Sequence, residues 1–304
     1  MNRKSFGFFI RAFALLALFA FTSFLFFSCK SKNVHDDWIP SASTLAIEND
    51  LFAQHKILLA FADAYPDRIS NVQFINDDWT MLVNDKLFYY AHGRFLPEDL
   101  RDQWEEYHPY DFYVYPWKGS DALRQLFIDN PVYSTGSSFL FDALYECHTE
   151  EESRSLQVEC SFIGINMLVH PYIKSKLDII ADEILAAARR DRGINEWIAE
   201  VQIDGLGHSW NWRVIAGTNR RSYHSYGTAI DLLPADLKGR LTYWRWNEDG
   251  NKKVNRKNYY MPPKKVIKIF EEYGFIWGGG WELIDTMHFE YRPEMLLLNG
   301  FKIK

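Results

Sequence analysis

The sequence lacks an excess of basic residues. Its 304 residues contain 34 Lys and Arg against 40 Asp and Glu, which gives a formal net charge of -6 at pH 7. A protein that binds nucleic acid usually carries a basic surface, because contacts to the phosphate backbone supply much of the affinity. The charge balance therefore argues against a nucleic-acid partner.

The sequence also lacks the polar bias of a disordered chain. Hydrophobic residues make up 47% of it, charged residues 24% and aromatic residues 17%. Such a composition provides enough apolar surface for a folded core, in one large domain or two of ordinary size. The aromatic share fits either a deep core or a cleft that holds a substrate by stacking, and composition does not separate these two possibilities.

Long uncharged runs are rare, and the one that begins the chain is short. Arg3 and Lys4 precede residues 12–27, which carry no charge and lead into Ser28 and Cys29. The run is shorter than the roughly 20 residues that span a bilayer comfortably. Together with Cys29 it resembles a bacterial lipoprotein signal, in which the cysteine receives lipid after cleavage. The alternative is an uncleaved membrane anchor.

Under both interpretations the rest of the chain is exported across the membrane. We predict that residues 1–29 are a lipoprotein-type signal peptide and that residues 30–46 are a polar tether. The folded part is then expected in the periplasm or cell envelope, held to a membrane through lipid on Cys29 or through the anchor.

Cysteine is scarce, with three residues in the whole chain. If Cys29 carries lipid, Cys147 and Cys160 remain as a pair in a compartment that permits disulfides. A bridge between them is one possibility. Two buried free thiols are another. Metal binding by Cys147 together with His148 is the third and weakest, because adjacent ligands rarely converge on one ion.

Residues 47–160 contain signals of helices and strands but no catalytic pattern. Apolar residues recur at near-helical spacing over residues 51–64, and Tyr65 and Pro66 are expected to end that helix. Residues 79–83 and 87–90 resemble two strands on either side of a turn. We therefore expect a mixed helical N-terminal region, whose role the sequence does not indicate.

Residues 161–304 carry a clearer α+β pattern. Apolar side chains between Leu177 and Ala188 follow the period of an amphipathic helix, which is expected to stop before Gly193. A second helix is expected to start at Pro262 and Pro263 and to close at Gly274. Short strands are expected at residues 161–169, 212–215, 229–232, 275–277 and 287–291.

Two motifs in this region carry potential metal ligands. The first contains His224 and Asp231, with Gly227 between them to let the backbone turn. The second contains Asp285 and His288. Two histidines and one carboxylate, here His224, His288 and Asp231, form a ligand set that leaves a fourth zinc position open for water.

Asp285 is the candidate general base of such a site. An attacking water needs a carboxylate that takes its proton and passes it to the leaving amine. On an unbroken strand Asp285 and His288 would point to opposite faces, because side chains alternate with a period of two residues. The hypothesis therefore requires a bend between them.

These motifs resemble those of the M15 family of zinc D,D- and L,D-peptidases. The matching patterns are Ser-x-His-x-x-Gly-x-Ala-x-Asp at residues 222–231, Trp-Gly-Gly at 277–279 and Asp-x-x-His-Phe-Glu at 285–290. The resemblance covers residues 161–293. It implies a small antiparallel sheet flanked by helices, as in Hedgehog-like domains, one Zn²⁺ ion on His224, Asp231 and His288, and Asp285 as the base.

The resemblance also suggests residues around the metal. The family has a substrate-holding arginine upstream of the first histidine, and Arg213 matches it; a structural ion pair is the alternative for Arg213. Ser222 and Trp281 are the other predicted substrate contacts, although Trp281 could instead pack in the core. Glu290 either orients a zinc ligand from outside the metal shell or is a solvated carboxylate.

The resemblance implies a zinc metallopeptidase, a carboxypeptidase or an endopeptidase, that hydrolyses amide bonds next to D-amino acids in peptidoglycan stem peptides. The alternative is a non-catalytic, zinc-containing module that binds the cell wall or acts as a scaffold. The presence of Asp285 beside a complete ligand set favours the enzyme. A third hypothesis makes residues 46–160 a partner-binding domain that recruits the peptidase.

Overall fold

A computed structural model describes residues 50–110, 112–120, 137–202, 208–215, 220–244 and 256–304. The predicted signal peptide, the tether and Cys29 lie outside these residues. Asp37–Lys304 form one compact unit. Among the described helices, none is both long enough and apolar enough to cross a membrane.

The N-terminal region begins with the predicted helix, α3 (Leu51–Ala64), whose bounds are confirmed. Asp50 caps it, since its side chain accepts hydrogen bonds from the backbone N–H groups of Phe52 and Ala53. One face is buried and includes Leu58 and Phe61.

An antiparallel sheet of four strands follows α3. The strands lie in sequence order, and the predicted hairpin at Asn84 and Asp85 is confirmed, with φ values of 45° and 64°. Positive φ at both central residues is typical of the tight turns that join twisted strands, and Asn and Asp tolerate it. The strands are β1 (Ile69–Ile75), β2 (Asp78–Val83), β3 (Lys86–Tyr89) and β4 (Leu96–Pro97).

The next segment contains two short helices and a hairpin. The single strand expected at residues 161–169 is wrong, because the chain reverses at Ile163 and Gly164. Cys147 and Cys160 are both free and buried, which is the second of the possibilities above. The elements are α5 (Phe139–Tyr145), α6 (Glu150–Leu156), β5 (Val158–Phe162) and β6 (Ile165–Val169).

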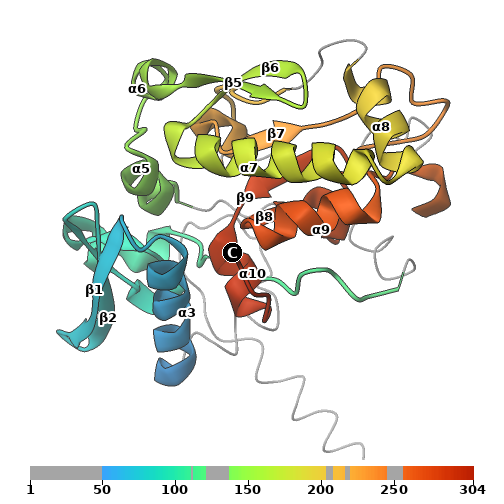
Figure 1. Cartoon of the computed structure of the whole chain (residues 1–304). Helices are drawn as coiled ribbons and strands as arrows, with labels where there is room; N and C mark the ends of the chain where they lie inside the picture. Colours follow the sequence, from blue (N-terminus) through green and yellow to red (C-terminus); the bar gives the residue numbers. More distant parts are fainter. Residues whose placement is uncertain (1–49, 111, 121–136, 203–207, 216–219, 245–255) are drawn as a thin grey trace, which may run out of the picture. The chain divides into compact units, whose positions relative to one another are not determined.

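The helices of the C-terminal half pack around its sheet (Figure 1). The helix expected over residues 177–188 is present but starts earlier, at Pro171, which occupies the first helical position. The second expected helix is also confirmed and ends at Glu272. The helices are α7 (Pro171–Ala188), α8 (Arg192–Gln202), α9 (Lys264–Glu272) and α10 (Pro293–Leu298).

The sheet that carries the site has three antiparallel strands in the order β7-β9-β8. Its inner face is buried against α9, where the rings of Phe270 and Phe289 stack with centroids 4.1 Å apart. The strand expected at residues 212–215 is wrong, because only a single bridge joins Val214 to Arg221. The strands are β7 (Ala229–Asp231), β8 (Phe275–Trp277) and β9 (His288–Tyr291). These elements confirm the α+β class.

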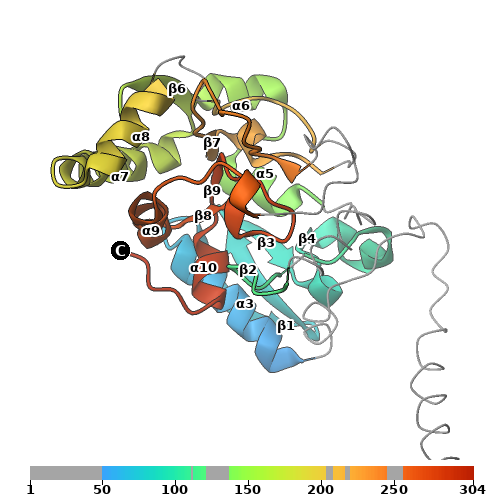
Figure 2. The same ribbon diagram turned by 90° about the vertical axis from the view of Figure 1, so that its right-hand side faces the viewer.

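Helix α3 of the N-terminal region packs against α10 of the C-terminal half, and both views show the two helices side by side (Figures 1 and 2). Tyr65, at the end of α3, is fully buried there, with its ring 5.9 Å from that of Tyr291 on β9. The packing connects the two regions directly. The predicted boundary at residue 160 stays a prediction.

Candidate metal centre

The three predicted zinc ligands lie together in the interior. Nε2 of His224 is 3.1 Å from Nδ1 of His288 and 3.2 Å from Oδ1 of Asp231. Nδ1 of His288 is 2.9 Å from the same Asp231 oxygen. All three side chains are buried. One ligand atom from each residue therefore points at a common point.

The backbone explains this convergence. Asp231 and His288 face each other across the paired strands β7 and β9, which places their side chains on the same face of the sheet. His224 comes from a 3₁₀ turn, η3 (Tyr223–Tyr226), which ends at Gly227 with φ +70°. A Cβ at Gly227 would lie 2.8 Å from the backbone nitrogen of His170, so this turn requires glycine.

Hydrogen bonds on the far side of each imidazole fix the protonation of the two rings. Nδ1 of His224 is 2.5 Å from the carbonyl oxygen of Ser209, and Nε2 of His288 is 3.0 Å from a carboxylate oxygen of Glu290. Carbonyl and carboxylate oxygens only accept hydrogen bonds, so these outer nitrogens carry the protons of neutral rings. In this neutral form, which a bound metal ion requires, the inner nitrogens direct their lone pairs at the point shared with Asp231.

Two imidazole lone pairs and one carboxylate oxygen repel each other at such short range unless a proton or a metal ion lies between them. The pKa values of His288 and Asp231 reflect this need for positive charge between the three groups. Burial lowers the pKa of His288, but the carboxylates of Asp231 and Glu290 outweigh it and raise that pKa to about 10. Burial raises the pKa of Asp231, yet His224 and His288 hold it well below its usual range. A donor set of two nitrogens and one oxygen fits Zn²⁺.

Asp285 lies three residues before the start of β9 and is followed by the turn that the sequence required. The backbone N–H of His288 donates to the carbonyl oxygen of Asp285 at 3.3 Å, so the chain bends between them. Burial raises the pKa of Asp285 to about 7, while the charges of His288 and Arg213 lower it and that of Asp231 raises it. The Oδ1 atom is shielded from solvent and has no hydrogen-bond partner among the described residues. A buried carboxylate oxygen in this state fits a group that bonds to substrate or water.

Arg213 is exposed, and its backbone N–H donates to Oγ of Ser225 at 2.9 Å. No ion pair of its guanidinium is found among the residues that the structure describes. Its charge is near enough to lower the pKa of Asp285. The substrate-holding role of Arg213 stays a prediction.

The other predicted contacts lie beside the ligands. Oγ of Ser222 accepts a hydrogen bond from the backbone N–H of His224 at 3.4 Å, so this buried serine caps the turn that holds a ligand. The ring of Trp281 is 5.2 Å from that of His288 and is partly buried. Substrate contact by Ser222 and Trp281 stays a prediction. Glu290 is buried against His288, an arrangement that fits the orienting interpretation better than a solvated carboxylate.

Sequence reasoning missed three residues around the site. Ser209 holds His224 through a backbone carbonyl, for which a sequence has no signal. Arg292 and Glu294 continue the series that begins at Glu290, with charges at every second position after His288. Within β9 the alternation places His288 and Glu290 on one face, but Arg292 and Glu294 lie beyond the strand, where this pattern gives no signal.

Comparisons with known proteins agree with the geometry. A family model described as D-alanyl-D-alanine carboxypeptidase, of the M15 peptidases, matches residues 216–291, which include the three clustered candidate ligands and Asp285. A second model, described as a domain of unknown function, matches residues 57–112. No solved structure matches the chain.

The chain is similar to the peptidoglycan L-alanyl-D-glutamate endopeptidase CwlK of Bacillus subtilis. The two are 30% identical over 135 residues, which is 41% of this chain and 74% of that protein. Most of the relative's length therefore aligns with a part of this chain. With the family match over the site, this shows that the chain belongs to the M15 family of peptidases.

Proposed function

We propose that the chain is a zinc-dependent peptidase that hydrolyses an amide bond next to a D-amino acid in peptidoglycan stem peptides. The observation that carries the proposal is the convergence of two imidazole nitrogens and one carboxylate oxygen within 3.2 Å of one another. The substrate class is supported by the similarity to an L-alanyl-D-glutamate endopeptidase.

His224, Asp231 and His288 would hold the ion. Bound zinc supplies Lewis acidity, which lowers the pKa of water and polarises a substrate carbonyl. Asp285 takes a proton from the attacking water and delivers it to the nitrogen of the leaving amine. Arg213, exposed and within electrostatic reach of Asp285, neutralises charge that develops on the carbonyl oxygen.

The test is metal analysis of the purified protein, followed by incubation with muropeptides and mass spectrometry of the products. We expect about one zinc ion per chain, as in other open catalytic zinc sites, and new fragments cut beside a D-amino acid. A zinc-loaded protein that leaves every muropeptide intact would favour the non-catalytic cell-wall module instead.

The pH dependence of the activity follows from Asp285. Burial raises its pKa to about 7 in the absence of a cation, and a nearby divalent ion would favour the carboxylate and lower that pKa. Because the base acts in its ionised form, kcat/KM at saturating zinc should rise with pH and level off at or below about pH 7. A profile that still rises steeply well above pH 8 would contradict the assignment of the base.

We also propose that the protein works in the cell envelope, tethered through lipid on Cys29, which would place it beside peptidoglycan. The support is the short apolar run before Cys29. Cys29→Ser should abolish incorporation of labelled fatty acid and move the protein from the membrane fraction to the soluble fraction. Equal labelling of the parent and the variant would exclude Cys29 as the acceptor.

A further inference from the structure

A hydrogen-bonded series of buried charged side chains leads away from the metal centre and consists of Glu290, Arg292 and Glu294. Glu290 uses one carboxylate oxygen for His288 and the other for Arg292, whose Nη1 donates to it at 3.4 Å. Nε of Arg292 donates to Oε1 of Glu294. Glu290, Arg292 and Glu294 are only 5%, 4% and 0% exposed. Charges buried this deeply are stable only when each one is paired and hydrogen-bonded.

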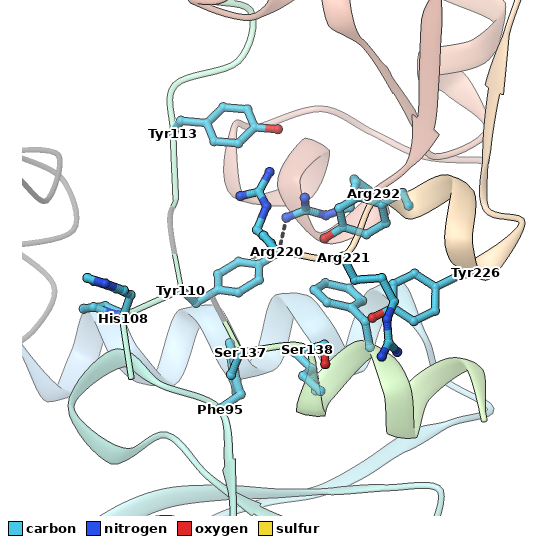
Figure 3. A pocket seen from close by; sticks show the side chains of 14 residues that line it. Phe95, His108, Tyr110, Tyr113, Ser137, Ser138, Arg220, Arg221, Tyr226 and Arg292 are labelled. Atoms are coloured by element: carbon cyan, nitrogen blue, oxygen red, sulfur yellow. Dashed lines mark hydrogen bonds between the residues drawn. The ribbon is translucent and has the colours of Figure 1, made fainter. Parts of the chain in front are cut away.

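The N-terminal region supplies the last two hydrogen-bond partners of this charged series. The hydroxyl of Tyr65 donates to Oε2 of Glu294 at 2.9 Å, and that of Tyr110 donates to Oε1 at 3.0 Å. Tyr110 in turn accepts a hydrogen bond from Nη2 of Arg292 (Figure 3, dashed line). Both tyrosines fall within residues 57–112, the segment that matches a domain of unknown function.

The two hydroxyls determine how Arg292 is shared. The guanidinium of Arg292 pairs with two carboxylates, Glu290 and Glu294. The two tyrosine hydroxyls donate further hydrogen bonds to Glu294. Without them, Arg292 is the only remaining described donor to Glu294. It would then turn toward Glu294 in a bidentate pair, the geometry that guanidinium and carboxylate groups favour.

The surroundings of Arg292 give it space to turn. A pocket of about 60 Å³ borders the charged series (Figure 3). It is lined by Tyr110 from the N-terminal region and by Tyr223 and Arg292 from the C-terminal half. A shift of Arg292 toward Glu294 would break its hydrogen bond to Glu290, which would keep its bond to His288 and the nearby charge of Arg220. The carboxylate of Glu290 would then be held less firmly, and the His288 imidazole that it orients would be less well aligned to bind a metal ion.

We propose that Tyr65 and Tyr110 are positioning residues of the metal centre, acting on His288 through Glu294, Arg292 and Glu290. The inference rests on the proposed function, in which His288 binds zinc. It gives residues 57–112 a role, because this region completes the outer hydrogen bonds of a site whose ligands all lie in the other half of the chain. Loss of such outer partners typically reduces metal affinity by about 10 to 100-fold.

The test uses the full chain with Tyr65→Phe and Tyr110→Phe combined, which removes two hydroxyls and keeps both rings. Titration with zinc against a chromophoric chelator should give a Kd at least about 10-fold above that of the parent. Tyr89→Phe is the matched control. Tyr89 is a buried tyrosine of the same region, and its hydroxyl accepts a hydrogen bond from Asn76 instead of contacting the charged series. Its Kd should equal that of the parent. Circular dichroism checks that each variant is folded, and Tyr110→Phe alone replaces the double variant if that one does not fold.

The outcomes separate the two proposals. A double variant that binds zinc as tightly as the parent overturns the positioning role and leaves the proposed function in place. An equal loss in Tyr89→Phe also overturns it, because the effect would then come from general packing. A parent that binds no zinc refutes the proposed function, and the positioning role with it.

Discussion

Asp285→Asn should bind zinc as the parent does and should reduce kcat by at least about 100-fold, the usual contribution of a general base. Asparagine has the shape of aspartate but cannot take a proton. The carboxylate of Asp285 is outside the cluster of three ligands, so the metal should not depend on it. Its Oδ1 atom has no partner in the described part of the chain, so the substitution breaks no hydrogen bond of that oxygen.

The measurement is steady-state hydrolysis of a defined stem peptide, with zinc content measured on the same sample. Asp236→Asn is a suitable control, because Asp236 is an exposed aspartate whose side chain, in the described part of the chain, accepts a hydrogen bond from the nearby backbone N–H of Lys238. We expect the control to match the parent in both assays. An Asp285→Asn enzyme with the kcat of the parent would remove Asp285 from its role.

Asp231→Asn should lose both zinc and activity. Asp231 supplies the only negative charge among the three ligands, and one of its oxygens lies within 3.2 Å of both imidazole nitrogens. Outer partners of a metal ligand already contribute about 10 to 100-fold to affinity, so a direct ligand should contribute more than about 100-fold. The near-identical shape of asparagine keeps the packing of β7.

Dialysis against a chelator of known affinity measures the loss, with Asp285→Asn as the comparison. The two variants should differ in one respect: both lose hydrolysis, but only Asp231→Asn loses the ion. If Asp231→Asn retained zinc at the parent's affinity, the ion would be bound elsewhere and the proposed ligand set would be wrong.

Much of the site could be predicted from the sequence because its ligands sit in two short motifs. The turn at Gly227 and the strands β7 and β9 are local features, and their sequence signals agree with the structure. The bend after Asp285 was required by the alternation of side chains along a strand, and it is present.

The errors in the fold have specific local causes. The β5–β6 hairpin turns through Ile163, a β-branched residue with φ 43°, so the usual turn residues give no warning there apart from Gly164. Helix α8 was missed because Gly193 resembles a helix stop, whereas Asp191 accepts hydrogen bonds from the backbone N–H groups of Gly193 and Ile194 and starts a new helix.

The hydrogen bonds that connect Glu290, through Arg292 and Glu294, to the N-terminal region could not be predicted at all. Tyr65 and Tyr110 are 229 and 184 positions away from Glu294 along the sequence. A buried tyrosine has no local pattern that reveals which carboxylate it will meet. Such contacts depend on how α3 packs against α10, which follows from the whole fold.

The most direct test of the account is an anomalous difference map, recorded at the zinc absorption edge from crystals of the zinc-loaded protein. We predict one strong peak about 2.0–2.2 Å from Nε2 of His224, Nδ1 of His288 and a carboxylate oxygen of Asp231. The absence of a peak at these three atoms, or a peak bound by other residues, would contradict it.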